Sequence, residues 1–210
     1  MIDYEGLPAP KEYYDGIGTV ITPETWFEIS GIEYAPARMP RRTPAALAKA
    51  AEEAFRTKRK DARKNDMQRL EKGAWIWVAQ ASGEAAAVQA VAIAMSSLSE
   101  AAYTDTGELT ASLASEKPLS AHTGSQLIDS LCSSPTLVVA GVGDSHLPEE
   151  ADALLELMEK RWRQKRATIF ASAYTGKTIS RALVRSGANT ERTRELVDLV
   201  SKAIRSGRQS

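Results

Sequence analysis

The chain has 210 residues, of which 43% are hydrophobic and 26% charged, and it contains a single cysteine. This length allows one domain with a short appendage, and the composition excludes wholesale disorder, a collagen-like repeat and a disulfide-stapled miniprotein. The chain begins without a basic and apolar leader and contains no membrane-length apolar run, so we expect a cytoplasmic protein that does not contact a membrane.

The net charge is zero, but the charges are segregated along the chain. Residues 38–72 carry a net charge of +7 and residues 160–194 carry +9, whereas residues 73–159 carry −11. Basic blocks of this kind are typical of a phosphate-facing surface, of a surface that pairs with acidic neighbouring subunits, or of solvated helix faces with no partner. The charge pattern alone leaves these three interpretations open.

The first part of the chain divides into an arm and a helical region. Residues 1–36 are rich in Pro, Gly, Tyr and acids, which predicts an irregular N-terminal arm, and residues 37–210 are expected to form the folded domain. Thr43 before Pro44 is typical of a helix start. The stretch that follows is rich in Ala, Lys, Arg and Glu and predicts one long helix that ends at Gly73.

From this point onward, apolar β-branched runs alternate with helical stretches. The expected strands are residues 74–80, 101–106, 136–143 and 167–174. The expected helices are residues 85–98, 107–114, 120–134, 148–166, 175–187 and 189–207. Strands and helices that alternate at this spacing predict an α/β fold with a parallel sheet covered by helices on both faces.

One segment matches the loose form of a phosphate-binding loop. Residues 171–178 read ASAYTGKT, so an active P-loop NTPase that uses Lys177 and Thr178 is an alternative function. A nucleotide-binding loop follows the first strand, because later strands supply the magnesium-binding acid, yet only 32 residues follow Thr178. Chance similarity is the favoured interpretation. The decisive observation is whether the strand at 167–174 is the first or the last of the sheet.

An earlier segment carries a more specific likeness. GAWIWVAQASGEAAAVQAVAIA, residues 73–94, resembles the strand, loop and helix around the nucleotide-binding loop of DnaC-type and IstB-type helicase loaders, which are AAA+ ATPases. The likeness continues in register through SEAAYTDTGELTASLA, SQLIDSLCSSPTLVVAGVG and EADALLELMEKRWRQKRATIFASAYT, over about residues 30–210. The resemblance implies an AAA+-like P-loop NTPase fold without a separate lid domain, a role in DNA replication, and a phage or mobile element as the source.

Every position that handles nucleotide chemistry in that family has changed in this sequence. Glu84 stands at the phosphate-binding Lys, and Ala85 stands at the Ser/Thr that binds magnesium. Ala140 and Gly141 replace the paired acids, and Ala173 replaces the polar residue after the next strand. A carboxylate at position 84 repels a polyphosphate, and the other changes remove magnesium coordination. The sequence therefore predicts a catalytically inactive pseudo-ATPase that uses no cofactor and no metal.

The resemblance also implies a protein partner. A helicase-loader-like chain is expected to bind a replicative helicase or another AAA+ subunit in a hetero-oligomer, and a decoy that inhibits host replication is the alternative. The candidate partner-binding residues are arm aromatics and two arginines in the region that resembles the trans-acting arginine site of the family: Trp26, Phe27, Tyr34, Arg192 and Arg194.

Basic and aromatic residues interleave in the second basic block. This pattern is typical of a stacking surface for single-stranded nucleic acid, although ordinary helix packing is the alternative for the tryptophan. The candidates for contact with single-stranded DNA are Arg161, Trp162, Arg163, Lys165 and Arg166.

Two further features of the sequence have unremarkable interpretations. Asp144, Ser145 and His146 are adjacent, and adjacent side chains on one loop rarely form the hydrogen-bonded chain of a catalytic triad. We therefore expect a helix-entry loop at this position. Cys132 lies at the end of an apolar helix, so we expect it to be a core residue rather than a nucleophile.

Overall fold

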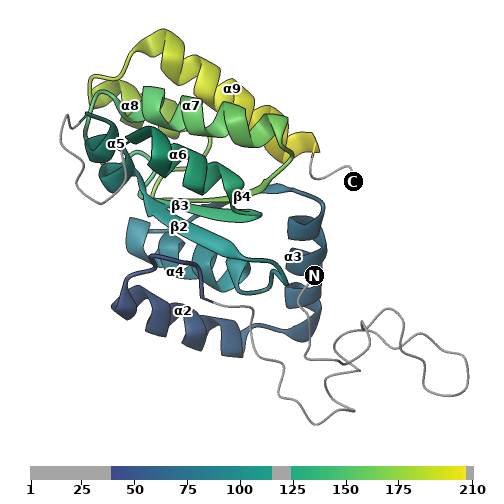
Figure 1. Ribbon diagram of the computed structural model, residues 1–210. Helices are drawn as coiled ribbons and strands as arrows, with labels where there is room; N and C mark the ends of the chain where they lie inside the picture. Colours follow the sequence, from purple (N-terminus) through teal and green to yellow (C-terminus); the bar gives the residue numbers. More distant parts are fainter. Residues whose placement is uncertain (1–38, 115–123, 207–210) are drawn as a thin grey trace, which may run out of the picture.

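The computed structural model describes residues 39–114 and 124–206, which form a parallel sheet between two layers of helices (Figure 1). In chain order the described elements are α2 (Ala45–Thr57), α3 (Lys60–Glu71), β1 (Trp75–Ala79), α4 (Gly83–Ala94), β2 (Ala101–Asp105), α5 (Thr106–Ala114), α6 (Gly124–Ser133), β3 (Thr136–Ala140), α7 (Glu150–Arg163), β4 (Ala167–Ser172), α8 (Ile179–Arg185) and α9 (Thr190–Ser206). The predicted α/β class and the predicted parallel sheet with helices on both faces are confirmed. The predicted boundary between residues 36 and 37 lies outside the described residues.

The four strands lie in the order β1-β4-β3-β2, and each neighbouring pair is parallel. The register aligns Tyr103 with Val138, Val138 with Ile169, and Ile169 with Ile76. These four side chains form a buried row across one face of the sheet. The last described strand, β4, therefore lies in the interior of the sheet between β1 and β3.

Each face of the sheet is covered by its own helices, as Figure 1 shows. On one face α4 packs on the strands and α2 packs on α4. Ala86 and Ala90 of α4 are completely buried, and their small side chains let the helix lie close to the sheet. On the other face α7 buries Leu157 and Met158, and α9 packs against α7. The two cores are therefore separated by the sheet itself.

The predicted long helix between Pro44 and Gly73 is wrong, because the chain breaks it into α2 and α3. Lys58 and Arg59 adopt extended backbone angles, with ψ of 137° and 146°. Phe55 is buried before the break and Leu70 after it, and the turn lets both reach the core. The predicted Thr43 cap is also wrong, because its hydroxyl donates to the carbonyl of Pro40 at 2.7 Å and residue 44 takes the N-cap position.

The described chain begins beside the outer edge of β2. The backbone N–H of Arg41 donates to the carbonyl of Ala101 at 3.0 Å, and the N–H of Tyr103 donates to the carbonyl of Arg41 at 3.0 Å. These bonds form a short parallel bridge. Arg41, which precedes α2, is thus attached to the sheet at the strand farthest from β1.

The described helices are too short or too polar to cross a membrane. The longest of them, α9, has 17 residues and reads TERTRELVDLVSKAIRS, with charges along its whole length. Within residues 39–114 and 124–206, no helix combines the length and the apolar character that a bilayer crossing requires.

Two turns meet at the amino ends of β1 and β4. Gly73 has a φ of +74° and Lys165 has a φ of +53°, so both lie in the left-handed region. A Cβ on Gly73 would overlap the carbonyl oxygen of Lys165. Glycine is required here both for its backbone angle and for the close approach of the two turns.

We expect Gly73→Ala to lower the free energy of unfolding by about 1 to 3 kcal/mol, because it introduces both backbone strain and a clash with a backbone carbonyl. Gly176→Ala is the matched control, since a Cβ there meets no atom within 4 Å. The control should change stability by less than about 0.5 kcal/mol. Urea unfolding followed by circular dichroism measures both values, and equal losses in the two variants would contradict the assignment.

Candidate functional site

The loop after β1 leads into α4, and a side chain of this loop caps the first turn of the helix. The Ser82 hydroxyl accepts a hydrogen bond from the backbone N–H of Ala85 at 3.2 Å, as an N-cap serine does. Glu84 lies exposed in the same turn. A helix start attracts anions through its free N–H groups and the positive end of its dipole. The Ser82 cap and the Glu84 charge both reduce that attraction.

A cavity of about 550 Å³ lies between this turn and the carboxyl ends of β2 and β3. Its charged lining residues are Glu84, Asp105 and Asp144, and none of the described residues that line it is Lys, Arg or His. Within the described ranges, no three His, Cys, Asp or Glu side chains are arranged to hold a metal ion. The cavity is therefore an anionic space at the edge of the sheet where a P-loop protein binds phosphate.

The carboxylate of Asp144 lies against the first turn of α4. A Cβ on Gly83 would approach the Oδ2 atom of Asp144 to 2.5 Å, so glycine leaves the room that this carboxylate occupies. Partial burial raises the pKa of Asp144, His146 opposes this shift, and the charge of Asp105 adds to it. An acidic side chain of the protein thus stands beside the helix start that a phosphate would approach.

Tyr103 lies on the wall of the cavity. Burial, followed by the carboxylates of Asp105 and Glu108, raises the pKa of Tyr103 to about 12. Two like unit charges about 5 Å apart repel each other by about 3 kcal/mol at an effective dielectric constant of about 20. A polyphosphate in this cavity would meet that repulsion from several carboxylates, with no lining cation to offset it.

The five positions at which the sequence departs from the helicase-loader pattern lie at this end of the sheet. Glu84, Ala140 and Gly141 line the cavity. Ala85 lies exposed in the first turn of α4, and Ala173 directly follows β4. Four of the five carry no polar side-chain atom and the fifth is an anion. The set therefore supplies neither charge neutralisation nor paired magnesium ligands.

Two carboxylates of the cavity, Asp105 and Asp144, were not among the site residues predicted from the sequence. The Oδ1 atom of Asp105 accepts a hydrogen bond from the N–H of Gly107 at 2.8 Å, which fixes the turn into α5. A Cβ on Gly141 would lie 2.8 Å from the Oδ2 atom of Asp105. The position of these acids in the sequence could have indicated them. Both lie at or shortly after the carboxyl end of a strand, where the binding loops of parallel sheets are found.

The Asp144-Ser145-His146 segment is a helix-entry loop, as predicted. The Ser145 hydroxyl donates to the carboxylate of Glu150, and the N–H of Gly143 donates to the same carboxylate at 2.6 Å. Burial raises the pKa of Glu150, and these two hydrogen bonds oppose the shift. Ser145 is therefore committed to the start of α7.

Cys132 is buried, and burial raises the pKa of its thiol, so its predicted role as a core residue is confirmed.

The loop that resembles a phosphate-binding loop follows β4, the last strand of the described sheet. A strand in this position is the result for which we expect the likeness of residues 171–178 to a phosphate-binding loop to be chance. Within the loop, the hydroxyl of Thr178 accepts a hydrogen bond from the N–H of Thr175 at 3.0 Å, and Lys177 lies exposed. The helix that follows, α8, has only 7 residues.

The prediction that Arg161 contacts nucleic acid is wrong, because its side chain is completely buried. Its guanidinium donates to the carbonyl of Leu131 at 2.6 Å, to the carbonyl of Ser134 at 2.9 Å and to the hydroxyl of Thr168 at 3.0 Å. It also donates to the carbonyl of Ala167. Burial lowers the pKa of Arg161 to about 9, so the group stays charged at neutral pH. Arg161 is a structural residue.

The other four predicted nucleic-acid residues lie around the end of α7. Trp162, Arg163 and Lys165 line a groove of about 830 Å³, and Arg163 and Lys165 are exposed. Arg166 is half-buried and does not line this groove. Its carbonyl accepts the indole N–H of Trp75 at 3.0 Å. The structure therefore brings together three of the five predicted side chains.

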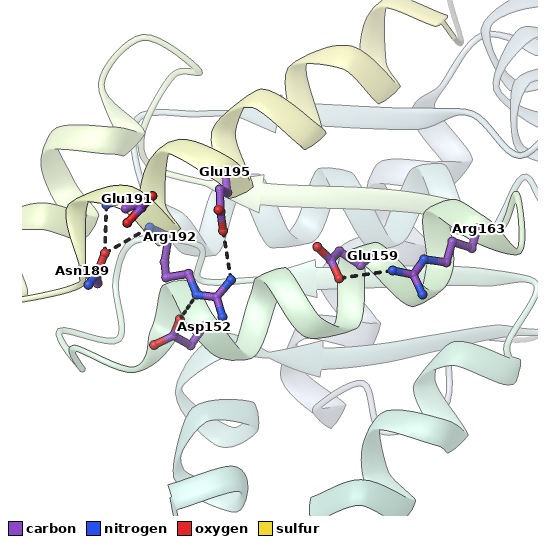
Figure 2. A network of polar contacts seen from close by, with 7 residues as sticks. All are labelled: Asp152, Glu159, Arg163, Asn189, Glu191, Arg192 and Glu195. Carbon is purple, nitrogen blue, oxygen red and sulfur yellow. Dashed lines mark hydrogen bonds and ion pairs between the residues drawn. The ribbon is translucent and has the colours of Figure 1, made fainter.

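The two arginines predicted to meet a partner lie at the start of α9. Figure 2 shows the Arg192 guanidinium between Asp152 of α7 and Glu195 of its own helix, with distances of 3.3 and 2.9 Å. These contacts tie α9 to α7, and the hydrogen bond to Glu195 raises the pKa of Arg192. The side-chain oxygen of Asn189 caps the helix by accepting hydrogen bonds from the N–H groups of Glu191 and Arg192. Arg194 is exposed.

The remaining candidate partner residues lie in the arm. Trp26, Phe27 and Tyr34 fall outside the described residues, so their role stays a prediction. Arg194 is accessible to a partner, whereas Arg192 would have to exchange the carboxylates of its own chain for those of another protein. The role of both arginines at an interface also stays a prediction.

Comparison with known proteins gives one loose structural likeness. No family model matches the chain, and the search of the curated proteins finds no match. Among solved structures, "Crystal Structure of the DnaI" is similar over 72% of this chain and 80% of that chain, at 18% identity and a TM-score of 0.37. A likeness this loose carries no argument about activity or partners.

We expect Arg161→Met to lower the free energy of unfolding by about 3 kcal/mol or more, because it leaves several buried carbonyl groups without a donor. Arg163→Met is the matched control, since this neighbouring side chain is 77% exposed and forms an ion pair with Glu159 at 3.7 Å. The control should change stability by less than about 0.5 kcal/mol. Chemical denaturation measures both, and a loss confined to Arg163→Met would contradict the assignment.

Proposed function

We propose that this chain is a helicase-loader-like pseudo-ATPase of DNA replication that binds a replicative helicase or another AAA+ subunit without using nucleotide. The observation that carries the nucleotide-independent part is the cavity at the carboxyl ends of the strands, which presents Glu84, Asp105 and Asp144 and no cation among its described lining residues. The helicase partner is supported by the sequence resemblance around residues 73–94. The proposal places the protein in the cytoplasm.

The charge distribution supports a binding protein rather than an enzyme. The acidic cavity replaces the chemistry of a nucleotide site with like-charge repulsion. The lysine and threonine of the alternative loop follow the last described strand, at positions 177 and 178. Single-stranded DNA is a further ligand within this proposal, since the basic blocks carry the complementary charge.

We expect the purified protein to bind no ATP in the presence of magnesium, because no lining cation neutralises the phosphates at the cavity. Isothermal titration calorimetry of the wild-type chain and of Lys177→Ala measures this directly. Neither protein should release binding heat at micromolar to millimolar ATP. If the wild-type chain binds ATP and Lys177→Ala does not, the alternative loop at residues 171–178 is established. If both proteins bind ATP, the pseudo-ATPase proposal is rejected.

We expect the arm to carry the contact with the helicase, because its sequence is rich in Pro and Gly and yet contains Tyr, Trp and Phe, which are enriched among interface anchors. Deletion of residues 1–30 should abolish capture by a replicative helicase and leave the circular dichroism and the melting cooperativity of the domain intact. Trp26→Ala is the milder variant, with an expected loss of affinity of about thirtyfold.

The competing possibility is that the arm packs on its own sheet, in which case the truncated protein melts earlier or aggregates. A truncated protein that stays folded and binds the helicase with unchanged affinity would reject the arm as the contact. A replication assay then separates a loader from a decoy, since a loader stimulates helicase-dependent synthesis and a decoy inhibits it.

A further inference from the structure

The groove of about 830 Å³ lies at the end of the sheet where β1 and β4 begin. The acidic cavity lies at the opposite end, where the strands finish. The groove is bounded by the end of α3, by the end of α7 and by the turns that lead from these helices into the sheet. In Figure 1, α3 and the end of α9 lie near this end of the sheet, and Ala203 of α9 contributes to the wall of the groove.

The groove combines cations from both basic blocks of the sequence. Arg69 and Lys72 come from the first block, Arg163 and Lys165 come from the second, and none of the described lining residues is acidic. In the sequence these pairs are separated by the acidic stretch of residues 73–159. The tertiary structure therefore joins cations that the sequence keeps apart.

Helix ends provide a competing explanation for these cations. The negative end of a helix dipole amounts to about half a charge and is stabilised by basic residues in the last turn. Arg69 and Arg163 occupy last turns, and Arg163 also pairs with Glu159 at 3.7 Å. The four cations of the groove outnumber the two half-charges of these helix ends, so the helix dipoles do not account for all of the positive charge. Lys72 is the C-cap residue of α3, whereas Lys165 lies beyond the C-cap of α7, outside the last turn on which the dipole acts.

The floor of the groove is held in one conformation. The backbone of Gly73 lies directly against the carbonyl of Lys165, so the two turns that carry the cations are locked together. Lys165 itself is held at a φ of +53°, an uncommon backbone conformation for a lysine. A preformed site of this kind loses little conformational entropy when it binds a ligand.

The groove also contains a fixed aromatic surface. Trp162 is half-buried, and its ring meets that of Trp75 in an edge arrangement, with centroids 5.8 Å apart and planes at 80°. Trp75 is in turn anchored by the hydrogen bond from its indole N–H to the carbonyl of Arg166. The amides of Asn65 and Gln68 line the same groove. Unpaired bases stack on such a ring, whereas the stacked bases of a duplex are not available to it.

We propose that this groove binds single-stranded nucleic acid, with backbone phosphates on Arg69, Lys72, Arg163 and Lys165 and one base stacked on Trp162. The inference deepens the proposed function and rests on its nucleic-acid part alone. It requires neither the helicase contact nor the absence of ATP binding.

The first experiment is fluorescence anisotropy of the full chain with a labelled oligothymidine of about 15 nucleotides, at several salt concentrations. The groove variant is the double substitution Arg163→Gln with Lys165→Gln. The matched control is Arg181→Gln with Arg185→Gln, which removes the same charge from exposed positions on α8 of the same basic block. At low salt the groove variant should bind about tenfold more weakly or worse, and the control should stay within about twofold of wild type. The salt dependence of the groove variant should also be less steep, by about 1.4 in the logarithmic slope for two lost phosphate contacts.

The second experiment tests the stacking surface. Trp162→Phe keeps an aromatic ring against Trp75 and reduces the area on which a base can stack. Oligothymidine should quench the tryptophan fluorescence of the wild-type chain, and this quenching should be lost in Trp162→Phe, with a threefold to tenfold loss of affinity expected from weaker stacking. Circular dichroism checks that each variant is folded.

The proposal is overturned if the groove variant binds oligothymidine like wild type, or if the control loses as much affinity as the groove variant. It is also overturned if a duplex of the same length binds as tightly, or if a polyglutamate peptide competes as well, which would indicate a surface for an acidic protein. Wild-type protein that fails to bind oligothymidine at low salt would reject both the groove and the nucleic-acid part of the proposed function. The ATP and helicase measurements would then still stand on their own results.

Discussion

The buried guanidinium of Arg161 is the interaction on which the packing of one face of the sheet depends. A charge taken out of water costs several kcal/mol unless its donors are satisfied, and an arginine has five of them. Here the donors reach carbonyls at the end of α6 and in the turn before β3, and also the first residues of β4. One side chain thus fixes α6, α7 and two neighbouring strands relative to one another. Both the groove and the start of β4 are built beside this point.

The two ends of the sheet carry opposite charges. At the carboxyl ends of the strands, Asp105 and Asp144 join Glu84 around a cavity, and at the amino ends Arg69, Lys72, Arg163 and Lys165 surround a groove. A net charge of zero therefore conceals two regions of strong and opposite potential. Ligands of opposite charge would therefore be attracted to different ends of the sheet.

The turn beside the acidic cavity shows that the charge of a site and the fold around it can be determined independently. β1 and the turn after it lead into α4, and the Ser82 hydroxyl caps this helix by accepting a hydrogen bond from the N–H of Ala85. The side chains around that turn, however, provide carboxylates where a phosphate would need cations. The backbone is determined by packing and capping, which are insensitive to the charge of an exposed residue such as Glu84. The charge at this turn can therefore change with little effect on the stability of the fold.

The sequence by itself determined the order and type of the described strands and helices after Gly73, because apolar β-branched runs and amphipathic stretches are local signals. It also identified Glu84, Ala140 and Gly141, which line the cavity, and Trp162, Arg163 and Lys165, which line the groove. The break after α2, the burial of Arg161 and the roles of Asp105 and Asp144 were decided only by the tertiary structure. Each of these depends on partners far away along the chain: Arg161 is buried because carbonyls from distant turns converge on it, and the cations of the groove meet because β1 and β4 pair. Such contacts leave no periodicity in the sequence, and the fold alone brings them together.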